Sequence, residues 1–514
     1  MDLGVLADPS GHPYIRMIAA PPLVEQARAT GDTETLVAIA DHLETLADSE
    51  PQLRSRCLYY MSLAAYLAAD TDLRRKPSAF ITFNNPLLRR ARAAVDQVLL
   101  DQEVHPSTRA EVLVARGRIA ALSLRWIESA AAFQRASGLS LGDPVHLMEL
   151  GIGIARLTSV AGQLIPERIL DQGRSALQEA LASPGLPAPQ AADARNYLAA
   201  LEQNMADGMM TPCSASDQPP DPPLDAYVSF CLEEDLLVNY CGGCALCPLG
   251  HSDADLTSFL GDSRADANET VGYFNQVEED YCAARYLAFA ATHPSAAQLK
   301  ADLVGHFIDP DGSLALDMGT VLQKVAYRTA ADVLDKIAGL LNTHFNLGFE
   351  RERCHFDRIF FDTRKEDKVL REKAQAACAT SISLSAIAEM ALDWHDPSRP
   401  ENGMRRRRNR LVHHYVRVTE DPAVQHTDDT TDKVSFGQEL LGMLRFVRRS
   451  GRAKSDSPIG DTAPRQQTEE EQHRCHDDRD VTTHRPSRPR SPWRRSRAKS
   501  RSSRSPSAST STRT

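Results

Sequence analysis

The chain has 514 residues, of which 42% are hydrophobic and 6% aromatic, and its net charge is −10. A chain of this length is too long to fold around one hydrophobic core, so two or more domains are expected. The final 30 residues hold ten of the 59 lysines and arginines and no acidic residue, which leaves 49 basic residues against 69 acidic ones elsewhere. A body this acidic excludes nucleic-acid binding over its whole surface, so RNA would bind at a local basic segment.

The sequence shows no signal for export or membrane insertion. No apolar run approaches the roughly 20 residues needed to span a bilayer, and the first residues lack the basic and apolar regions of a signal peptide. Ten cysteines in a chain of this length do not resemble a secreted disulfide framework. We therefore expect a cytoplasmic protein with mostly free thiols and no membrane partner.

The N-terminal part predicts helices. Residues 1–20 are interrupted by proline and glycine and are expected to be irregular. Alanine and leucine then dominate, which favours a series of amphipathic helices over residues 22–205. Residues 54–69 and 87–100 are expected to form an early helix pair. Together with the C-terminal pattern described below, this predicts an all-α fold.

One helix pair in this region repeats a pattern. The small and apolar spacing that begins at Ala110 recurs at Trp126, and a new unit opens at Val145 after a Gly142-Asp-Pro144 break. The spacing is close to the roughly 34 residues of a tetratricopeptide unit, and the glycines and alanines suit close helix packing. The region resembles degenerate tetratricopeptide repeats and predicts an α-solenoid that binds a protein or ligand trigger. An irregular helical bundle is the alternative.

Residues 206–264 are predicted to be a linker with a cysteine-rich segment. Its start, at 208–225, is rich in proline and serine. The candidate zinc ligands are Cys241, Cys244, Cys247 and His251. The two Cys-x-x-Cys steps share Cys244, which is tighter than zinc-finger spacing, and no second distant pair follows. We therefore favour free cysteines and predict no metal or cofactor.

Residues 265–450 predict a compact all-α domain. Apolar stripes at helical spacing indicate helices at 271–291, 318–346, 365–394, 404–418 and 434–447. His344, Cys354 and His355, near the end of the second helix, are expected to be core or surface residues. After 450, apolar residues nearly vanish, so 451–514 are expected to be disordered. No phosphate loop occurs, so nucleotide hydrolysis is not predicted.

The fourth of these helices carries Arg408-Asn409 followed by His413. On a helix, Asn409 and His413 are four residues apart and share a face, and the long Arg408 side chain can reach the same phosphate. Arginine stays charged and binds phosphate, while histidine titrates near neutral pH and suits proton transfer. These are the groups that cleavage of RNA by its own 2′-hydroxyl requires. One helix supplies one histidine, so a two-fold homodimer would complete the site.

The Arg-Asn-x-x-x-His pattern resembles the signature of HEPN domains. Further likeness lies in the segments that begin at Tyr273, Asp332 and Leu341. The resemblance implies a helical bundle with metal-independent endoribonuclease activity in a dimer, catalytic Arg408 and His413, and Asn409 as their polar partner. It also implies a toxin or anti-phage defence effector gated by the repeats.

The basic residues around this pattern predict where RNA would bind. The predicted RNA-contacting residues are Arg405, Arg406, Arg407, Arg410 and His414. The alternative function is a non-catalytic helical adaptor. Such an adaptor would bind protein partners through its repeats and would use the HEPN-like bundle to bind RNA or itself.

Overall fold

The computed structural model describes residues 3–75, 85–140, 142–161, 165–208, 225–238, 253, 267–295, 314–315, 317–362, 369–397, 399–414, 416–423, 426–427 and 429–455. Met1–Gly460 form one compact unit. The described residues are overwhelmingly helical, which confirms the all-α prediction. No described helix is long and apolar enough to cross a membrane.

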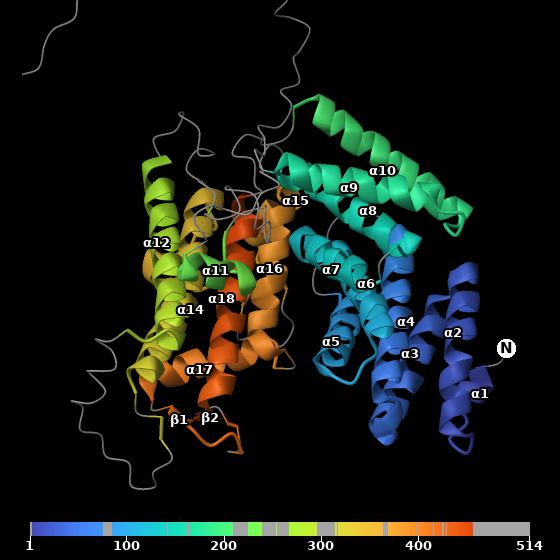
Figure 1. Cartoon of the computed structure of the whole chain (residues 1–514), viewed down its shortest axis with the longest axis horizontal. Coiled ribbons are helices and arrows are strands. Elements are labelled where there is room, and N and C mark those ends of the chain that lie inside the picture. Colours follow the sequence, from blue (N-terminus) through green and yellow to red (C-terminus); the bar gives the residue numbers. More distant parts are fainter. Residues whose placement is uncertain are drawn as a thin grey trace, which may run out of the picture. The chain divides into compact units, whose positions relative to one another are not determined.

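The N-terminal part is a succession of helices, each of which packs against the next in the chain from α2 to α10 (Figure 1). Stacked helical pairs contact one another in this order. The assignment to a tetratricopeptide type stays a prediction. The helices, with one short 3-10 turn, are α1 (Leu3–Ala7), α2 (Pro13–Thr30), α3 (Thr33–Ser49), η1 (Pro51–Leu53), α4 (Arg54–Arg75), α5 (Pro86–Leu100), α6 (Pro106–Leu122), α7 (Trp126–Leu139), α8 (Pro144–Ala161), α9 (Glu167–Ala182) and α10 (Ala188–Ala206).

The expectation that residues 1–20 are irregular is wrong, because α1 and most of α2 lie there. His12 caps α2 by accepting a hydrogen bond from the Tyr14 amide, and Pro13 occupies the first turn, where no backbone donor is needed. Leu6 and Ala20 are completely buried against the helices that follow. Tertiary packing of these apolar side chains therefore outweighs the helix-breaking tendency of the prolines within α2.

Helices α6 and α7 pack at very short range, as the glycines in this region predicted. Gly117 of α6 faces the ring of Phe133 of α7, and a Cβ atom at Gly117 would collide with that ring. Phe133 is completely buried. A glycine is needed here because the aromatic ring occupies the space that any other side chain would fill.

The segment predicted to be a linker contains a packed helix. Helix α11 (Ala226–Glu233) lies within 206–264, and its Cys231, together with Leu236 just after it, is completely buried in the C-terminal core. The Tyr281 hydroxyl donates to the Leu236 carbonyl at 2.7 Å. The linker prediction is therefore wrong for 225–238, because apolar residues there cover the helices that follow.

The C-terminal part is a bundle around α14, which contacts α12, α17 and α18. Its core includes Leu334, Ile337, Phe356 and Phe436, all nearly or fully buried. The elements are α12 (Ala267–Thr292), α14 (Met318–Phe345), the 3-10 turn η5 (Arg351–Arg353), α15 (Glu372–Thr380), α16 (Ile382–His395), α17 (Pro400–His413), β1 (Arg417–Thr419), β2 (Thr430–Asp432) and α18 (Lys433–Ser455).

Several helix boundaries differ from the predicted ones. The helix expected at 365–394 is two helices, because Ser381 is extended and its hydroxyl caps α16 by accepting from the Leu384 amide. Helix α17 begins at Pro400, which suits a first helical position, and not at Met404. Helix α18 continues to Ser455, past the predicted start of the disordered tail at 451. Residues 456–514 lie outside the described part.

Helix α17 also ends earlier than predicted, at His413. The chain then turns into β1, which pairs in parallel with β2. Val418 and Thr419 are buried in this short pair. Alternation of β-branched residues explains the strand, which helical periodicity alone did not anticipate.

Candidate functional site

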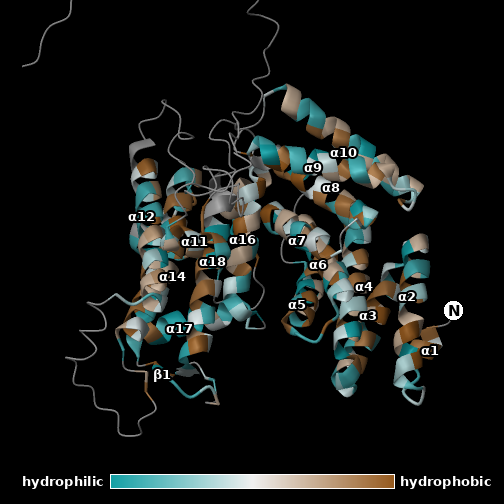
Figure 2. Ribbon diagram, viewed as in Figure 1, coloured by the Kyte–Doolittle hydropathy of each residue, from teal (hydrophilic) through white to brown (hydrophobic). Residues whose placement is uncertain are grey.

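The Arg-Asn-x-x-x-His segment occupies the last turns of α17, which is largely hydrophilic (Figure 2). Asn409 and His413 are both exposed, and both belong to the helix. Their spacing of four residues therefore places them on one face, as expected from the sequence. His413 is the final residue of α17, just before the chain leaves the helix toward β1.

Arg408 points from α17 to α14. Its Nη2 lies 2.8 Å from Oδ1 of Asp332 and 3.4 Å from Oδ2 of Asp335, two residues spaced almost one turn apart on α14. Its Nη1 donates to Oδ1 of Asn409 at 3.4 Å. These contacts fix the guanidinium beside Asn409 while a quarter of the arginine side chain stays exposed. The position holds a cation at the edge of the exposed face of α17.

Asp335 also binds a histidine that the sequence did not assign to the site. Nδ1 of His355 lies 3.4 Å from Oδ2 of Asp335, and the amide of Phe356 donates to Oδ1 at 3.1 Å. His355 is half-buried and was expected to be a core or surface residue. Its proximity to Arg408 depends on the turn after α14, which has no sequence signature.

Arg405 forms a second, more buried cluster. Its Nη1 donates to Oδ2 of Asp357 at 3.1 Å and to Nδ1 of His395 at 2.8 Å. Burial acts to raise the pKa of Asp357, but the polar contact with His395 and the charge of Arg405 outweigh it and lower that pKa. This cluster ties α17 to α16 and to the segment after α14. It gives Arg405 a structural role that competes with RNA contact.

Arg407 does not lie on a surface that could bind RNA. It is 7% exposed, and its Nε lies 3.4 Å from Oε2 of Glu439 on α18. Tyr327 donates to the same carboxylate at 2.7 Å, and burial followed by the Glu439 charge raises the pKa of Tyr327 well above its usual value. Burial thus corrects the prediction that Arg407 contacts RNA, since the residue joins α17 to the core.

The other predicted RNA-contacting residues remain near the surface. Arg406 is exposed and donates to Oδ1 of Asn402 at 3.1 Å. Arg410 is partly exposed, with its Nε 3.2 Å from Oδ1 of Asp429 before β2. His414 is exposed and extended, and its amide donates to the Arg410 carbonyl. Acidic partners therefore neutralise much of the arginine run, which the sequence alone presented as an open cationic stretch.

The cysteine-rich candidates, Cys241, Cys244, Cys247 and His251, lie outside the described residues. Within the described part, no cluster of three or more histidine, cysteine, aspartate or glutamate side chains is arranged to hold a metal ion. The described free thiols are those of Cys57, Cys231, Cys282, Cys354 and Cys378.

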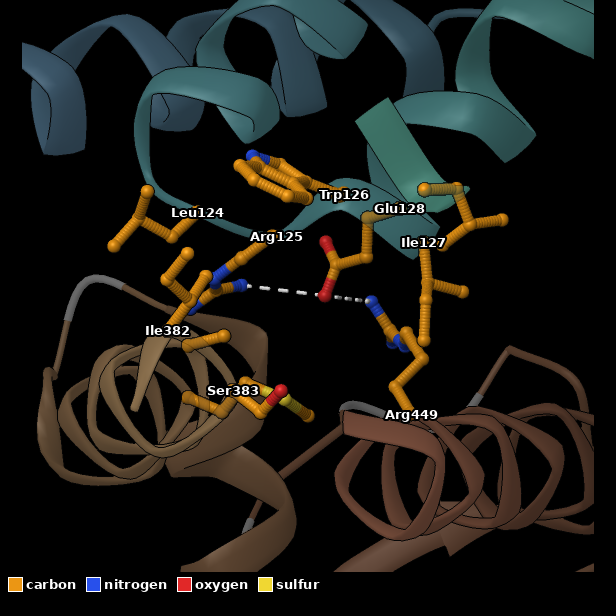
Figure 3. A pocket seen from close by; sticks show the side chains of 11 residues that line it. Leu124, Arg125, Trp126, Ile127, Glu128, Ile382, Ser383 and Arg449 are labelled. Atoms are coloured by element: carbon orange, nitrogen blue, oxygen red, sulfur yellow. Dashed lines mark hydrogen bonds and ion pairs between the residues drawn. The ribbon is translucent and has the colours of Figure 1, made fainter. Parts of the chain in front are cut away.

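A small pocket lies between the N-terminal helices and the bundle (Figure 3). Its volume of about 30 Å³ suits water and not a substrate. Glu128 of α7 accepts from Arg125 at 3.5 Å and pairs with Arg449 of α18 at the same distance. The pocket is part of a charged contact between the two regions.

That contact reaches the start of α17. Arg399, the residue that precedes α17, binds Oδ2 of Asp96 on α5 at 2.8 Å and also lies beside the buried Asp393. Arg92 and Arg125, both from the N-terminal region, form further ion pairs with Asp393. The N-terminal helices are thus connected by charge to the helix that carries Arg408 and His413.

Comparison with known proteins identifies the C-terminal bundle as a known type of domain. Residues 262–450 match a family model described as LA2681-like HEPN. No curated protein and no solved structure matches the chain. The matched range includes α12 to α17, most of α18, and therefore Arg408, Asn409 and His413. The chain contains an LA2681-like HEPN domain at residues 262–450 and is a HEPN-domain protein.

Proposed function

We propose that the HEPN domain is a metal-independent endoribonuclease in which Arg408, Asn409 and His413 carry the reaction. The observation that carries the proposal is that one end of α17 presents both a guanidinium held in a fixed orientation and an exposed imidazole. Arg408 is held by Asp332 and Asp335 beside Asn409, and His413 is exposed one turn further on the same helix. A phosphodiester placed over this end of α17 would meet both a positive charge and an imidazole.

The chemistry follows from these groups. The 2′-hydroxyl loses its proton and attacks the adjacent phosphorus, the phosphorus–O5′ bond breaks, and the 5′-oxygen takes up a proton. Arg408 would stabilise the negative charge on the phosphorane, and Asn409 would donate a hydrogen bond to it. His413 would transfer one of the two protons. The products are a 2′,3′-cyclic phosphate and a 5′-hydroxyl.

The acidic partners of Arg408 impose a condition on RNA binding. A phosphate must approach a guanidinium that already faces two carboxylates, so binding competes with Asp332 and Asp335. Arg406 and Arg410, at the surface of α17, would help by attracting the RNA backbone. We propose that a homodimer forms through the outward face of α17, where Val412 is 44% exposed next to His413.

The N-terminal helices would gate the activity in a toxin or defence effector. Support comes from Arg399, which directly precedes α17 and binds Asp96 of α5. A trigger that moved α5 would shift Asp96 and, through its ion pair with Arg399, the helix that carries the catalytic residues. The trigger would be a protein or ligand bound by the helical array.

The test uses the full-length protein and total cellular RNA in the presence of EDTA. Wild type should cleave and leave 2′,3′-cyclic phosphate ends, while Arg408→Ala and His413→Ala should each lose at least about 100-fold in rate. His42→Gln, on α3, is a matched control that should cleave normally. Cleavage that survives in both site variants would contradict the assignment.

Arg407, Arg408 and Arg410 already form ion pairs within the chain, which leaves less positive charge for catalysis. This favours a second function, that of a non-catalytic adaptor that binds RNA or itself through the bundle. In that case wild type would shift RNA in a gel without cutting it. Loss of binding in Arg408→Ala without any cleavage by wild type would support the adaptor.

A further inference from the structure

We propose that His355 is a further catalytic residue, the general base for the 2′-hydroxyl, and that it supplies the second imidazole within one protomer. The inference rests on the proposed ribonuclease function. It starts from one shared atom: Oδ2 of Asp335 contacts both Nδ1 of His355 and Nη2 of Arg408, each at 3.4 Å. The two nitrogens are therefore no further apart than the sum of these distances, so a phosphate held by Arg408 lies within reach of His355.

The contact with Asp335 defines how His355 would act. A histidine that donates its Nδ1 proton to a carboxylate keeps Nε2 as the proton acceptor, the arrangement found in base catalysis by Asp–His pairs. Asp335 is itself held by the Phe356 amide at 3.1 Å. The His355 side chain is 41% exposed, so the ring can meet a substrate at the surface. Asp335 is thus a positioning residue for both Arg408 and His355.

His395, in the same domain, also lies beside an aspartate but is enclosed by the protein. Nδ1 of His395 lies 2.8 Å from Nη1 of Arg405 and 3.5 Å from Oδ2 of Asp357, and the His395 side chain is only 19% exposed. That ring is enclosed between α16 and α17. His355 differs in two ways: its side chain is 41% exposed, and no arginine nitrogen is placed against its Nδ1 among the described contacts.

Two histidines account for both proton transfers of the reaction. Nε2 of His355 takes the proton of the 2′-hydroxyl as the O2′–phosphorus bond forms. His413, protonated, gives its proton to the 5′-oxygen as the phosphorus–O5′ bond breaks. No oxidant, reductant or co-reactant is needed. In this scheme the partner's second histidine is not required for chemistry, although a dimer can still form.

The experiment measures single-turnover cleavage of the RNA that wild type cuts, over a range of pH. His355→Gln should lose about 100-fold or more in rate with little change in the RNA concentration for half-saturation. It should also lose the acidic limb of the pH profile, since that limb reports the base. Among the described residues, Asp335 on α14 contacts this ring, Arg408 on α17 shares that carboxylate and also pairs with Asp332, and Glu352 lies three residues earlier on the same segment.

Controls separate catalysis from folding. His355→Gln should melt within a few degrees of wild type because the residue is half-exposed, and added imidazole should restore part of the rate of His355→Ala. His42→Gln should match wild type throughout. If His413→Ala is inactive while His355→Gln cleaves at the wild-type rate, the His355 proposal is overturned and the ribonuclease proposal stands. If wild type cuts no RNA, both proposals fail together.

Discussion

Arg92 of α5 and Asp393 of α16, which are 301 residues apart in the chain, form a buried ion pair between the N-terminal helices and the HEPN domain. Asp393 is fully buried, and Arg125 and Arg399 lie against the same carboxylate. Burying either the carboxylate or the guanidinium groups alone would be very costly. The two regions must therefore meet in the one arrangement that brings these charges together. This pairing makes the two regions one structural unit.

Asp393→Asn should destabilise the protein strongly. Removing this charge leaves buried arginines without their partner, and breaking such a pair costs about 3–5 kcal/mol. Urea unfolding at pH 7 measures the effect. Glu25→Gln, which removes the exposed partner of Arg28 on α2, is the matched control and should change stability by less than about 1 kcal/mol. Equal effects of the two substitutions would show that Asp393 contributes no more than a surface pair.

Acid should weaken the same contact. Burial acts to raise the pKa of Glu128, but the charges of Arg125, Arg449 and Arg116 outweigh it and hold the pKa at about 2. The pKa of Asp393 is likewise lowered, with Arg125 and Arg92 outweighing burial. A carboxyl whose folded pKa is depressed stabilises the fold above its unfolded pKa, and that stabilisation is lost as pH falls toward the folded pKa.

The resulting window lies below the ordinary carboxyl values of 4.5 for Glu128 and 3.8 for Asp393. Wild-type stability should therefore fall steeply between about pH 4.5 and pH 2. Glu128→Gln should show a shallower fall, because this group no longer takes up a proton on unfolding. Unfolding curves at several pH values measure both slopes, and parallel slopes would contradict the prediction.

Arg407 and Arg406 should behave oppositely when replaced by alanine. Arg407→Ala removes a buried guanidinium and leaves the partly buried Glu439 without its cation next to the Tyr327 hydroxyl, so a loss of about 1–3 kcal/mol is expected. Arg406 is exposed, so its replacement should change stability by no more than about 0.5 kcal/mol while weakening RNA binding at low salt. Thermal melting and gel-shift titrations distinguish the two roles. A stable Arg407→Ala protein with weakened RNA binding would reverse our placement of this residue.

Two glycines test the packing of α6 against α7. Gly117→Ala places a methyl group against the ring of Phe133 and should cost about 1–3 kcal/mol. Among the described residues, Gly138 on α7 has no atom outside its own stretch of helix within 4 Å of an added Cβ, so Gly138→Ala should be neutral or stabilising by up to about 1 kcal/mol. Chemical denaturation of both variants gives the comparison. A tolerated Gly117→Ala would mean that the two helices can separate without loss.

Local sequence determined the helical class, most helix positions and the place of the Asn409–His413 pair. Helix propensity and a 3.6-residue apolar period act over neighbouring residues, so they can be read from a linear chain. The errors were also local in origin. Prolines in α2 and at the start of α17 suggested breaks, but the chain uses them inside or at the first position of helices. Ser381 divides a stretch that has helical periodicity on both sides.

Only the tertiary structure decided how the charges pair. The arginine run of α17 looks uniform in sequence, yet Arg407 is buried, Arg408 is aligned by α14, and Arg410 faces the segment before β2. His355 joins the site through a turn that brings it to Asp335, and Asp393 meets arginines some 300 positions earlier in the chain. Such pairings depend on which surfaces meet after folding, because electrostatic partners are selected by distance in space and not by spacing along the chain.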